Sequence, residues 1–288
     1  MAPLPFVNPA AFWAGGSIDN PCRFCFNKGL MQVCFLMANA YIVATHSYRG
    51  GTGKSNTTAN LAVELAKLSL RVGVVDTDLP SPGVHILFGQ DEPEVTINGV
   101  LTRTYDVAKA FLDVTPASIS SGKVFLMAGS PKPGDIARIV KEGYSMDQMV
   151  EIYKGFIKHA ALDVLLLDTH PGINETTLFS ITVADLLLMI LRPDRQDYQG
   201  TAVTVDVARK LGVPDLKILV NKALTSLDWA QLRQTIEATY SAPCIGVLPQ
   251  TDDIMRYGGS GLFTIQEPDH PLSVTLRDVA AQINALRS

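Results

Sequence analysis

Residues 41–58 read YIVATHSYRGGTGKSNTT, and this stretch decides the fold of the chain. Its first five residues are apolar and β-branched, which predicts a short buried strand over 41–45. Residues 48–53 are rich in glycine and predict a turn. From Lys54 onward the apolar residues recur at the spacing of an amphipathic helix. The predicted order is therefore strand, glycine-rich loop, Gly-Lys-Ser and helix.

This order fits a bound triphosphate. Glycines at 50, 51 and 53 let the loop turn its backbone N–H groups inward, and the start of the helix adds a positive dipole. Lys54 can reach the β- and γ-phosphates, and the hydroxyl of Ser55 can ligate Mg²⁺. A chance glycine turn is the alternative, and the presence of both a strand and a helix disfavours it.

The loop resembles the deviant Walker A box of the ParA/MinD ATPases, whose pattern is Lys-Gly-Gly-x-Gly-Lys-Ser/Thr. Residues 49–55 read RGGTGKS. In that family the first lysine crosses an ATP-sandwiched dimer to the partner's nucleotide, and here Arg49 holds its place. Arg49 keeps the charge and is bulkier, so either it acts in trans or a later lysine, such as Lys141 or Lys154, does. Carboxysome-positioning proteins of the McdA type also depart here, which makes them a candidate subgroup.

Two aspartates follow the next predicted strand, residues 71–76. Because the carboxyl ends of neighbouring parallel strands meet at one edge of a sheet, Asp76 and Asp78 are expected to face the phosphates. The resemblance identifies this segment as switch I. It implies that Asp78 orients the attacking water and that Asp76 lies near Mg²⁺. The alternative is a plain exit from strand to loop, where aspartate is common.

A continuous apolar run over residues 162–168 ends in Asp168. Such a run predicts a strand buried on both faces, with the aspartate at its tip beside Mg²⁺. The family places switch II directly after this aspartate, and here residues 169–172 read THPG. His170 departs from the usual small residue. A contact within the switch loop, or an exposed histidine, is expected in preference to a catalytic role.

The resemblance places the adenine side of the site at the end of a later strand, residues 216–222. Near its end is Asn221, whose amide offers a donor and an acceptor to a purine edge. The resemblance also implies that the loop 249–252 lies beside the adenine. The expected nucleotide contacts are Gly50, Gly51, Thr52, Gly53, Lys54, Ser55, Asn56, Asn221, Pro249 and Thr251. The expected neighbours of the metal are Ser55, Asp76 and Asp168, and the expected catalytic residues are Lys54, Asp78 and Arg49.

The remaining sequence alternates between predicted strands and helices. Strands are expected at 123–128, 185–191 and 244–248. Helices are expected near 135–142, 146–160, 195–211, 226–239 and 271–286, with short ones within 95–107 and 108–112. Apolar positions expected in the core are Met149, Tyr153, Phe156 and Ile157, and Leu272, Leu276, Val279, Ile283 and Leu286. The fold class is therefore α/β, a doubly wound, mostly parallel sheet with helices on both faces.

Residues 1–36 differ from the ATPase domain predicted for residues 37–288. They are rich in Phe, Pro, Cys and Gly, and Cys22 with Cys25 makes only half of a zinc site. Ala-Asn-Ala at 38–40 after an apolar run resembles a signal-peptide cleavage site, but an ATP-driven protein is expected in the cytoplasm. The favoured interpretation is a start at Met37 or Met31, after a leader that is disordered or not native.

Together these motifs predict a Mg-dependent ATPase whose homodimer forms around ATP and separates after hydrolysis. The resemblance implies a cytoplasmic, nucleoid-associated ParA-like protein. Such a protein binds non-specific DNA and distributes a plasmid, chromosome or carboxysome through an adaptor protein. The net charge of −4 argues against a strongly basic protein but allows a local basic patch. The candidate cations are Lys217, Lys222, Arg233, Arg256 and Arg277.

Three alternatives stay open. A MinD-like cell-division regulator carries a basic amphipathic helix at its C-terminus, and no such membrane anchor is expected where this chain stops, at Arg287-Ser288. A metallocluster protein needs cysteines after the switch segments or near the C-terminus, and Cys244 stands alone there, so no cluster is expected. The third alternative is an ATP-binding scaffold with little turnover.

Overall fold

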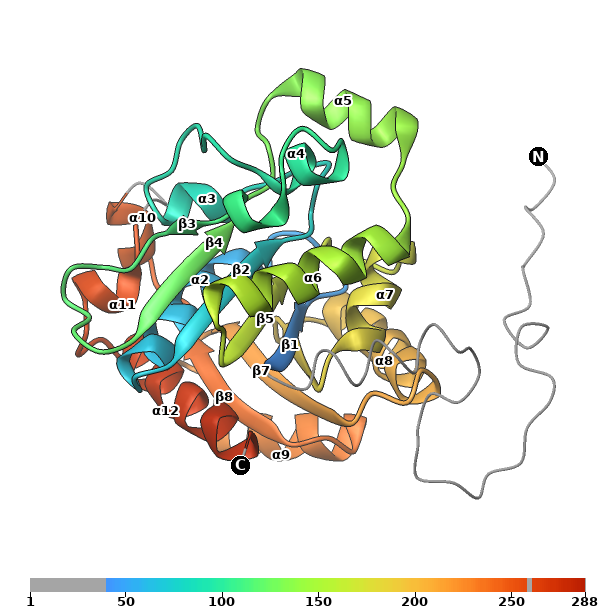
Figure 1. Cartoon of the computed structure of the whole chain (residues 1–288). Coiled ribbons are helices and arrows are strands. Elements are labelled where there is room, and N and C mark those ends of the chain that lie inside the picture. The colour runs from blue at the N-terminus through green and yellow to red at the C-terminus, as the bar shows by residue number, and fades with distance from the viewer. Residues whose placement is uncertain (1–39, 258–260, 288) are drawn as a thin grey trace, which may run out of the picture. The chain divides into compact units, whose positions relative to one another are not determined.

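One eight-stranded sheet organises the residues that this computed structural model describes, 40–257 and 261–287 (Figure 1). The order across the sheet is β3-β4-β2-β5-β1-β6-β7-β8. The two-residue strand β3 pairs antiparallel with β4, and all other neighbours pair parallel. The predicted fold class is confirmed. The predictions for the leader, which concern Cys22, Cys25, Met31 and Met37, lie outside the described residues.

The strands match the predicted apolar runs closely. They are β1 (Tyr41–His46), β2 (Arg71–Asp76), β3 (Leu112–Asp113), β4 (Lys123–Met127), β5 (Val164–Asp168), β6 (Leu186–Leu191), β7 (Asp215–Ala223) and β8 (Cys244–Pro249). Every residue of β5 and β6 is buried, because helices cover both faces of these central strands. That double burial explains why their sequences are continuously apolar instead of alternating.

Helices connect the strands and form a layer on each side. They are α2 (Lys54–Lys67), α3 (Val84–Leu87), α4 (Ile97–Leu101), α5 (Pro133–Glu142), α6 (Met146–Ala160), α7 (Glu175–Val183), α8 (Arg195–Lys210), α9 (Trp229–Tyr240), α10 (Asp253–Arg256), α11 (Phe263–Gln266) and α12 (Pro271–Leu286). Among the described residues, no helix combines the length and the apolar character needed to cross a membrane.

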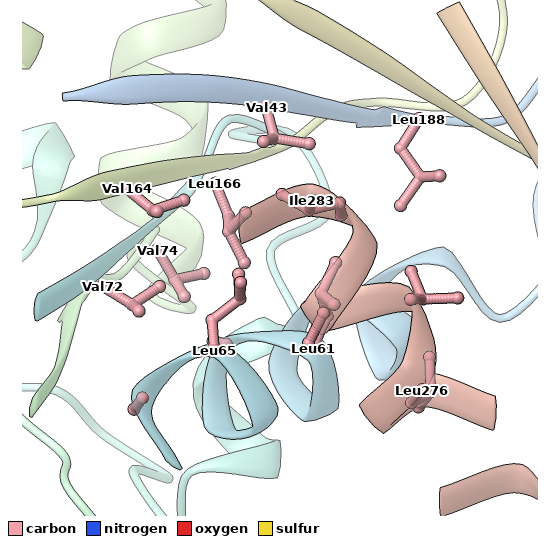
Figure 2. Close-up of a cluster of buried hydrophobic side chains, with 14 of the residues drawn as sticks. Val43, Leu61, Leu65, Val72, Val74, Val164, Leu166, Leu188, Leu276 and Ile283 are labelled. Carbon is pink, nitrogen blue, oxygen red and sulfur yellow. The ribbon is translucent and has the colours of Figure 1, made fainter. Parts of the chain in front are cut away.

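The first core layer lies between the sheet and the helices α2 and α12. Leu61 and Leu65 of α2 point toward the strands together with Ile283 of α12 (Figure 2). The sheet contributes β-branched and leucine side chains, among them Val72 and Val74 of β2, which alternate with a residue facing the other way. Burying one such side chain contributes about 1.5–3 kcal/mol, so this layer anchors the helix that follows the glycine-rich loop.

The second layer covers the opposite face with α6, α8 and α9. Met149, Tyr153, Phe156 and Ile157 of α6 are all buried, as their helical spacing predicts. Gly73 of β2 faces this layer, and a Cβ there would lie 3.0 Å from the ring of Phe156. The capping box of Ser145 and Gln148 fixes the start of α6.

Two expectations about elements are wrong. Residues 108–112 were expected to form a helix, but residues 107–109 make one 3-10 turn and Leu112 begins the edge strand β3. Phe111 packs against the rings of Phe125 and Phe156, so tertiary packing outweighs local propensity there. Leu286, expected in the core, is 39% exposed at the last turn of α12.

The sheet brings the candidate site residues together at the carboxyl ends of its central strands. The first strand in sequence, β1, lies between β5 and β6, so the chain winds outward from it in both directions. The register pairs Thr45 with Asp168 and Asp76 with Asp168, which places the carboxyl ends of β1, β5 and β2 side by side. In open α/β sheets, ligands bind at the carboxyl ends of the strands where the direction of winding reverses, as it does here at β1.

Candidate functional site

The glycine-rich loop joins the end of β1 at His46 to the start of α2 at Lys54. Gly51 and Gly53 have φ angles of 76° and 89°, which only glycine adopts without strain. Gly53 is also required for space, since a Cβ would lie 2.4 Å from the amide nitrogen of Asn221. The loop is therefore shaped by backbone conformation and by contact with β7.

Asp168 is the meeting point of the loop and the sheet. Its Oδ1 lies 2.8 Å from the ammonium of Lys54, and its Oδ2 accepts a hydrogen bond of 2.6 Å from the hydroxyl of Ser55. Thr58 also donates to Oδ1, at 3.0 Å, and lies 2.7 Å from the hydroxyl of Thr45. Lys54 and Asp168 are buried, so each charge depends on the other.

Asp76 lies beside Asp168 and is fully buried. Its Oδ2 accepts hydrogen bonds from the backbone N–H groups of Gly83 at 2.9 Å and Val84 at 3.3 Å, and its Oδ1 from that of Asp78 at 3.1 Å. Burial and the charge of Asp168 raise the pKa of Asp76 to about 7. A cation bound beside these two carboxylates would reduce the repulsion between their charges.

Asp78 lies in the loop after β2 and faces switch II. Its Oδ1 is 3.9 Å from Nε2 of His170. Burial raises the pKa of Asp78, while the positive charge of Lys54 acts in the opposite direction. His170 also lies 2.6 Å, through Nδ1, from the carbonyl oxygen of Pro171. Switch I and switch II therefore meet through these two side chains.

His46 is a residue that the sequence motifs do not single out. It is buried at the end of β1, and its Nδ1 lies 2.8 Å from the hydroxyl of Thr169. Thr169 donates its single hydroxyl hydrogen to the carbonyl oxygen of Thr45 at 3.0 Å, so Nδ1 of His46 carries the ring proton. Burial and the nearby charge of Lys54 lower the pKa of His46 to about 3. The ring is therefore neutral.

A cavity of about 760 Å³ opens beside the loop, between β7, β8 and α12. Its polar end is formed by Gly53, Asn56 and Thr57. The apolar part of its lining includes Leu224, Leu248 and Leu272, and the charged residues Arg192, Asp194, Lys222 and Asp252 also line it. Of the nucleotide contacts expected from the sequence, the structure brings these to the cavity: Gly53, Asn56, Asn221, Pro249 and Thr251.

The amide of Asn221 is tied to the glycine-rich loop. Its nitrogen donates to the carbonyl oxygen of Thr52 at 2.8 Å, and its oxygen accepts from the backbone N–H of Lys222 at 2.8 Å. Lys222 in turn donates to the carbonyl oxygen of Gly51 at 2.7 Å. Asn221 therefore supports the loop as well as lining the cavity.

Arg49 contacts its own chain. Its guanidinium donates to the side-chain oxygen of Gln196 at 2.5 Å and lies 4.0 Å from the carboxylates of Asp194 and Asp197, at the start of α8. Asp197 is buried and also accepts hydrogen bonds from Arg192. Of the residues expected to be catalytic, Arg49 is thus held by the start of α8, whereas Lys54 contacts Asp168 and Asp78 faces His170.

The two lysines considered in place of Arg49 lie on other helices. Lys141 is exposed in the last turn of α5. Lys154, on α6, pairs with Glu151 at 3.3 Å.

The residues present fit a magnesium-bound triphosphate. The hydroxyl of Ser55 and the carboxylates of Asp76 and Asp168 are oxygen ligands of the kind that Mg²⁺ prefers. Lys54 lies next to them, and the loop leaves the buried hydroxyl of Thr52 without a hydrogen-bond partner among the described residues. Bound Mg²⁺ would neutralise charge on the phosphates.

Comparison with known proteins identifies the family of the chain. The family model ParA, described as "NUBPL iron-transfer P-loop NTPase", matches residues 39–284. An uncharacterized ATP-binding protein of Methanocaldococcus jannaschii is 28% identical over 255 residues, 86% of this chain and 88% of that protein. An iron–sulfur cluster carrier protein of Methanococcus maripaludis is 28% identical over 186 residues, which cover 63% of this chain and 60% of that protein.

A solved structure shows the same fold. The septum site-determining protein MinD of Pyrococcus horikoshii, complexed with Mg-ADP, superposes with a TM-score of 0.72 at 20% identity. The match covers 86% of this chain and 97% of that one. Since the family model spans most of the sequence, and the loop and strand tips have the arrangement described above, the chain belongs to the ParA/MinD family of P-loop NTPases.

Proposed function

We propose that this protein binds Mg·ATP, hydrolyses it, and alternates between a monomer and a homodimer held by ATP. The observation that carries the proposal is the convergence of Lys54 and Ser55 on Asp168, with Asp76 and Asp78 beside them. Phosphoryl transfer needs positioning and charge neutralisation more than covalent help, and this cluster supplies both.

Each residue has a distinct part in the proposed reaction. Lys54 and the backbone N–H groups of the loop hold the β- and γ-phosphates. Ser55, Asp76 and Asp168 hold the metal ion, and to reach the phosphates Lys54 moves off the carboxylate that it contacts at 2.8 Å. Asp78 orients the attacking water. The cavity lined by Asn221 and residues 249–251 takes the adenine.

The cargo class that we propose is ParA-like. The protein would bind non-specific DNA on the nucleoid when dimeric and distribute a plasmid, chromosome or carboxysome through an adaptor protein. An McdA-type role is the narrower form, motivated by Arg49 in place of the signature lysine. Two of the candidate cations for DNA binding are already paired with carboxylates: Lys217 with Asp215 at 2.9 Å and Arg256 with Asp253 at 2.7 Å. Surface charge therefore adds little support for DNA binding.

Turnover is tested by phosphate release from purified protein with Mg·ATP. We expect slow release by the wild type and none by Lys54→Ala, which loses the phosphate contact. Lys210→Ala, at the exposed end of α8, is the matched control and should retain activity. A wild type that binds ATP but releases no phosphate would instead be a scaffold.

Dimerisation is tested with Asp78→Ala, which should bind ATP but hydrolyse it far more slowly than the wild type. Light scattering should then report a stable dimer with ATP and a monomer without it. An Asp78→Ala protein that stays monomeric with saturating ATP would refute the switch.

Binding to DNA and binding to membranes are compared to test where the protein acts. ATP-dependent binding to random duplex DNA, weakening steeply with salt, supports the ParA-like role. ATP-dependent binding to anionic liposomes, without DNA binding, would support a MinD-like role instead. Neither result bears on the ATPase proposal itself.

Iron transfer, named in the description of the matched family model, is the second candidate. Cys244 is the sole cysteine among the described residues and is buried in β8, where burial raises the pKa of its thiol. A protonated, buried thiol is a poor ligand, so we rank this function lower. Anaerobic reconstitution with iron and sulfide, followed by visible absorption, tests it.

A further inference from the structure

Nε2 of His170 and Oδ1 of Asp78 face each other across the gap between switch II and switch I. They are 3.9 Å apart, which is longer than a hydrogen bond and short enough for one water molecule to bridge. Asp78 is largely buried and His170 is 36% exposed. Solvent therefore reaches His170, while protein covers most of Asp78.

Hydrogen bonding determines which nitrogen of His170 faces the gap as an acceptor. Nδ1 lies 2.6 Å from the carbonyl oxygen of Pro171, which can only accept. Nδ1 therefore carries the ring proton, and in the neutral ring Nε2 has a free lone pair. The side-chain nitrogen of Asn174 also approaches Nδ1, at 3.3 Å, while its oxygen caps α7. The much shorter contact with Pro171 decides the tautomer.

The backbone around His170 is held in place by contacts to β1 and α7. The N–H of Gly172 donates to the carbonyl oxygen of Ser47 at 3.1 Å, and the hydroxyl of Thr177 donates to the carbonyl oxygen of His170 at 3.3 Å. On the other side, Thr169 is fixed by its bond to Thr45 and its contact with His46. His170 is thus presented from a constrained loop, as a reacting group must be.

We propose that His170 is a further catalytic residue, which holds the attacking water jointly with Asp78. The water donates one hydrogen to Nε2 of His170 and the other to the carboxylate of Asp78. Its lone pair is then directed away from both acceptors, toward the γ-phosphate. This inference rests on the proposed ATPase function and names a residue of the same site.

The step balances without a separate base. A bond forms between the water oxygen and the γ-phosphorus while the bond from that phosphorus to the bridging oxygen breaks. The electron pair of the broken bond stays on ADP, and both protons of the water leave with the inorganic phosphate, as H2PO4−. Only orientation is asked of His170, which agrees with the loose transition state of phosphoryl transfer.

Three substitutions at His170 test the assignment by phosphate release under saturating Mg·ATP. His170→Ala should lower kcat about a hundredfold, since loss of positioning costs about that much, while KM for ATP stays unchanged. His170→Gln places an amide oxygen near the position of Nε2 and should restore much of kcat. His170→Asn reaches only the position of Nδ1 and should not. His159→Ala, at the exposed end of α6, is the control.

A double variant adds an independent readout. Because both side chains are assigned to one water, Asp78→Ala with His170→Ala should be no slower than Asp78→Ala alone. Light scattering should show that His170→Ala still dimerises with ATP. Wild-type kcat in His170→Ala, or a loss that appears only in KM, would overturn the inference while leaving the ATPase intact. A wild type without phosphate release would refute the proposed function itself.

Discussion

At the scale of single residues, Thr58 links the sheet to the site through its hydroxyl. It donates to Asp168 at 3.0 Å and lies 2.7 Å from Thr45, with both threonines buried. Thr58→Val keeps the shape but removes the donor, so we expect the free energy of unfolding to fall by about 1–3 kcal/mol. Urea unfolding measures this loss. Thr239→Val, on the exposed face of α9 and bonded only within its helix, should change it little.

His46 makes stability depend on pH in a predictable direction. Its pKa is about 3 in the folded protein and about 6.5 in an unfolded chain. Between those values the unfolded state binds the extra proton, so the free energy of unfolding falls as pH falls below about 6.5, by up to about 1.4 kcal/mol per pH unit. Asp76, with its raised pKa, acts in the opposite direction.

The contribution of His46 is isolated by comparison with His46→Gln. Urea unfolding between pH 7.5 and pH 5 should show a flatter decline for the variant, because it lacks the titrating ring. Equal slopes for the two proteins would mean that the ring titrates in the folded state as it does in the unfolded chain.

Sequence motifs predict some of these residues and miss others for a physical reason. Lys54 and Ser55 follow from the glycine-rich loop that precedes a helix, and Asp168 follows from an apolar run that ends at a strand tip. His46 and Thr58 carry no such signal, because a buried polar side chain in an apolar stretch looks the same whether or not it has a partner. Only the three-dimensional neighbours distinguish the two cases.

At the scale of elements, the start of α8 packs directly on the loop. A Cβ at Gly200 would lie 1.9 Å from the ring of Tyr48, the residue next to Arg49. We therefore expect Gly200→Ala to destabilise the protein by about 1–3 kcal/mol through overpacking and to weaken ATP binding by displacing the loop. Nucleotide titration and urea unfolding measure both effects.

Gly134→Ala provides the matched control for that prediction. Gly134 also lies in a helix, α5, but a Cβ there meets nothing within 4 Å. If Gly200→Ala bound ATP as tightly as this control, the packing of α8 on the loop would not matter for the nucleotide.

Long apolar runs made the parallel strands predictable, because burial on both faces leaves no other pattern. The short pieces between β2 and β4 were not, since β3 depends on pairing with Leu126 and Phe125. Helix α7, rich in β-branched residues over 175–183, also gives no clear helical periodicity. Its place is determined by the cap at Asn174 and by packing.

At the scale of the whole molecule, all strands of the described sheet and all the candidate site residues lie after position 40. We expect a variant lacking residues 1–36 to bind Mg·ATP like the full chain. Calorimetric titration of the two proteins measures this. Loss of binding in the truncated protein would show that the leader belongs to the fold. The motifs predicted the ATPase domain but carry no information on cargo, which depends on surface residues without fixed spacing.

The hold of α8 on Arg49 has a consequence for assembly. Before that guanidinium can cross to a neighbouring subunit, it must leave Gln196 and two carboxylates of its own chain. The cost of this release falls on every encounter between monomers and is recovered only when a partner's phosphates replace the lost contacts. The contacts of Arg49 with α8 would then oppose dimerisation of monomers that have no bound ATP.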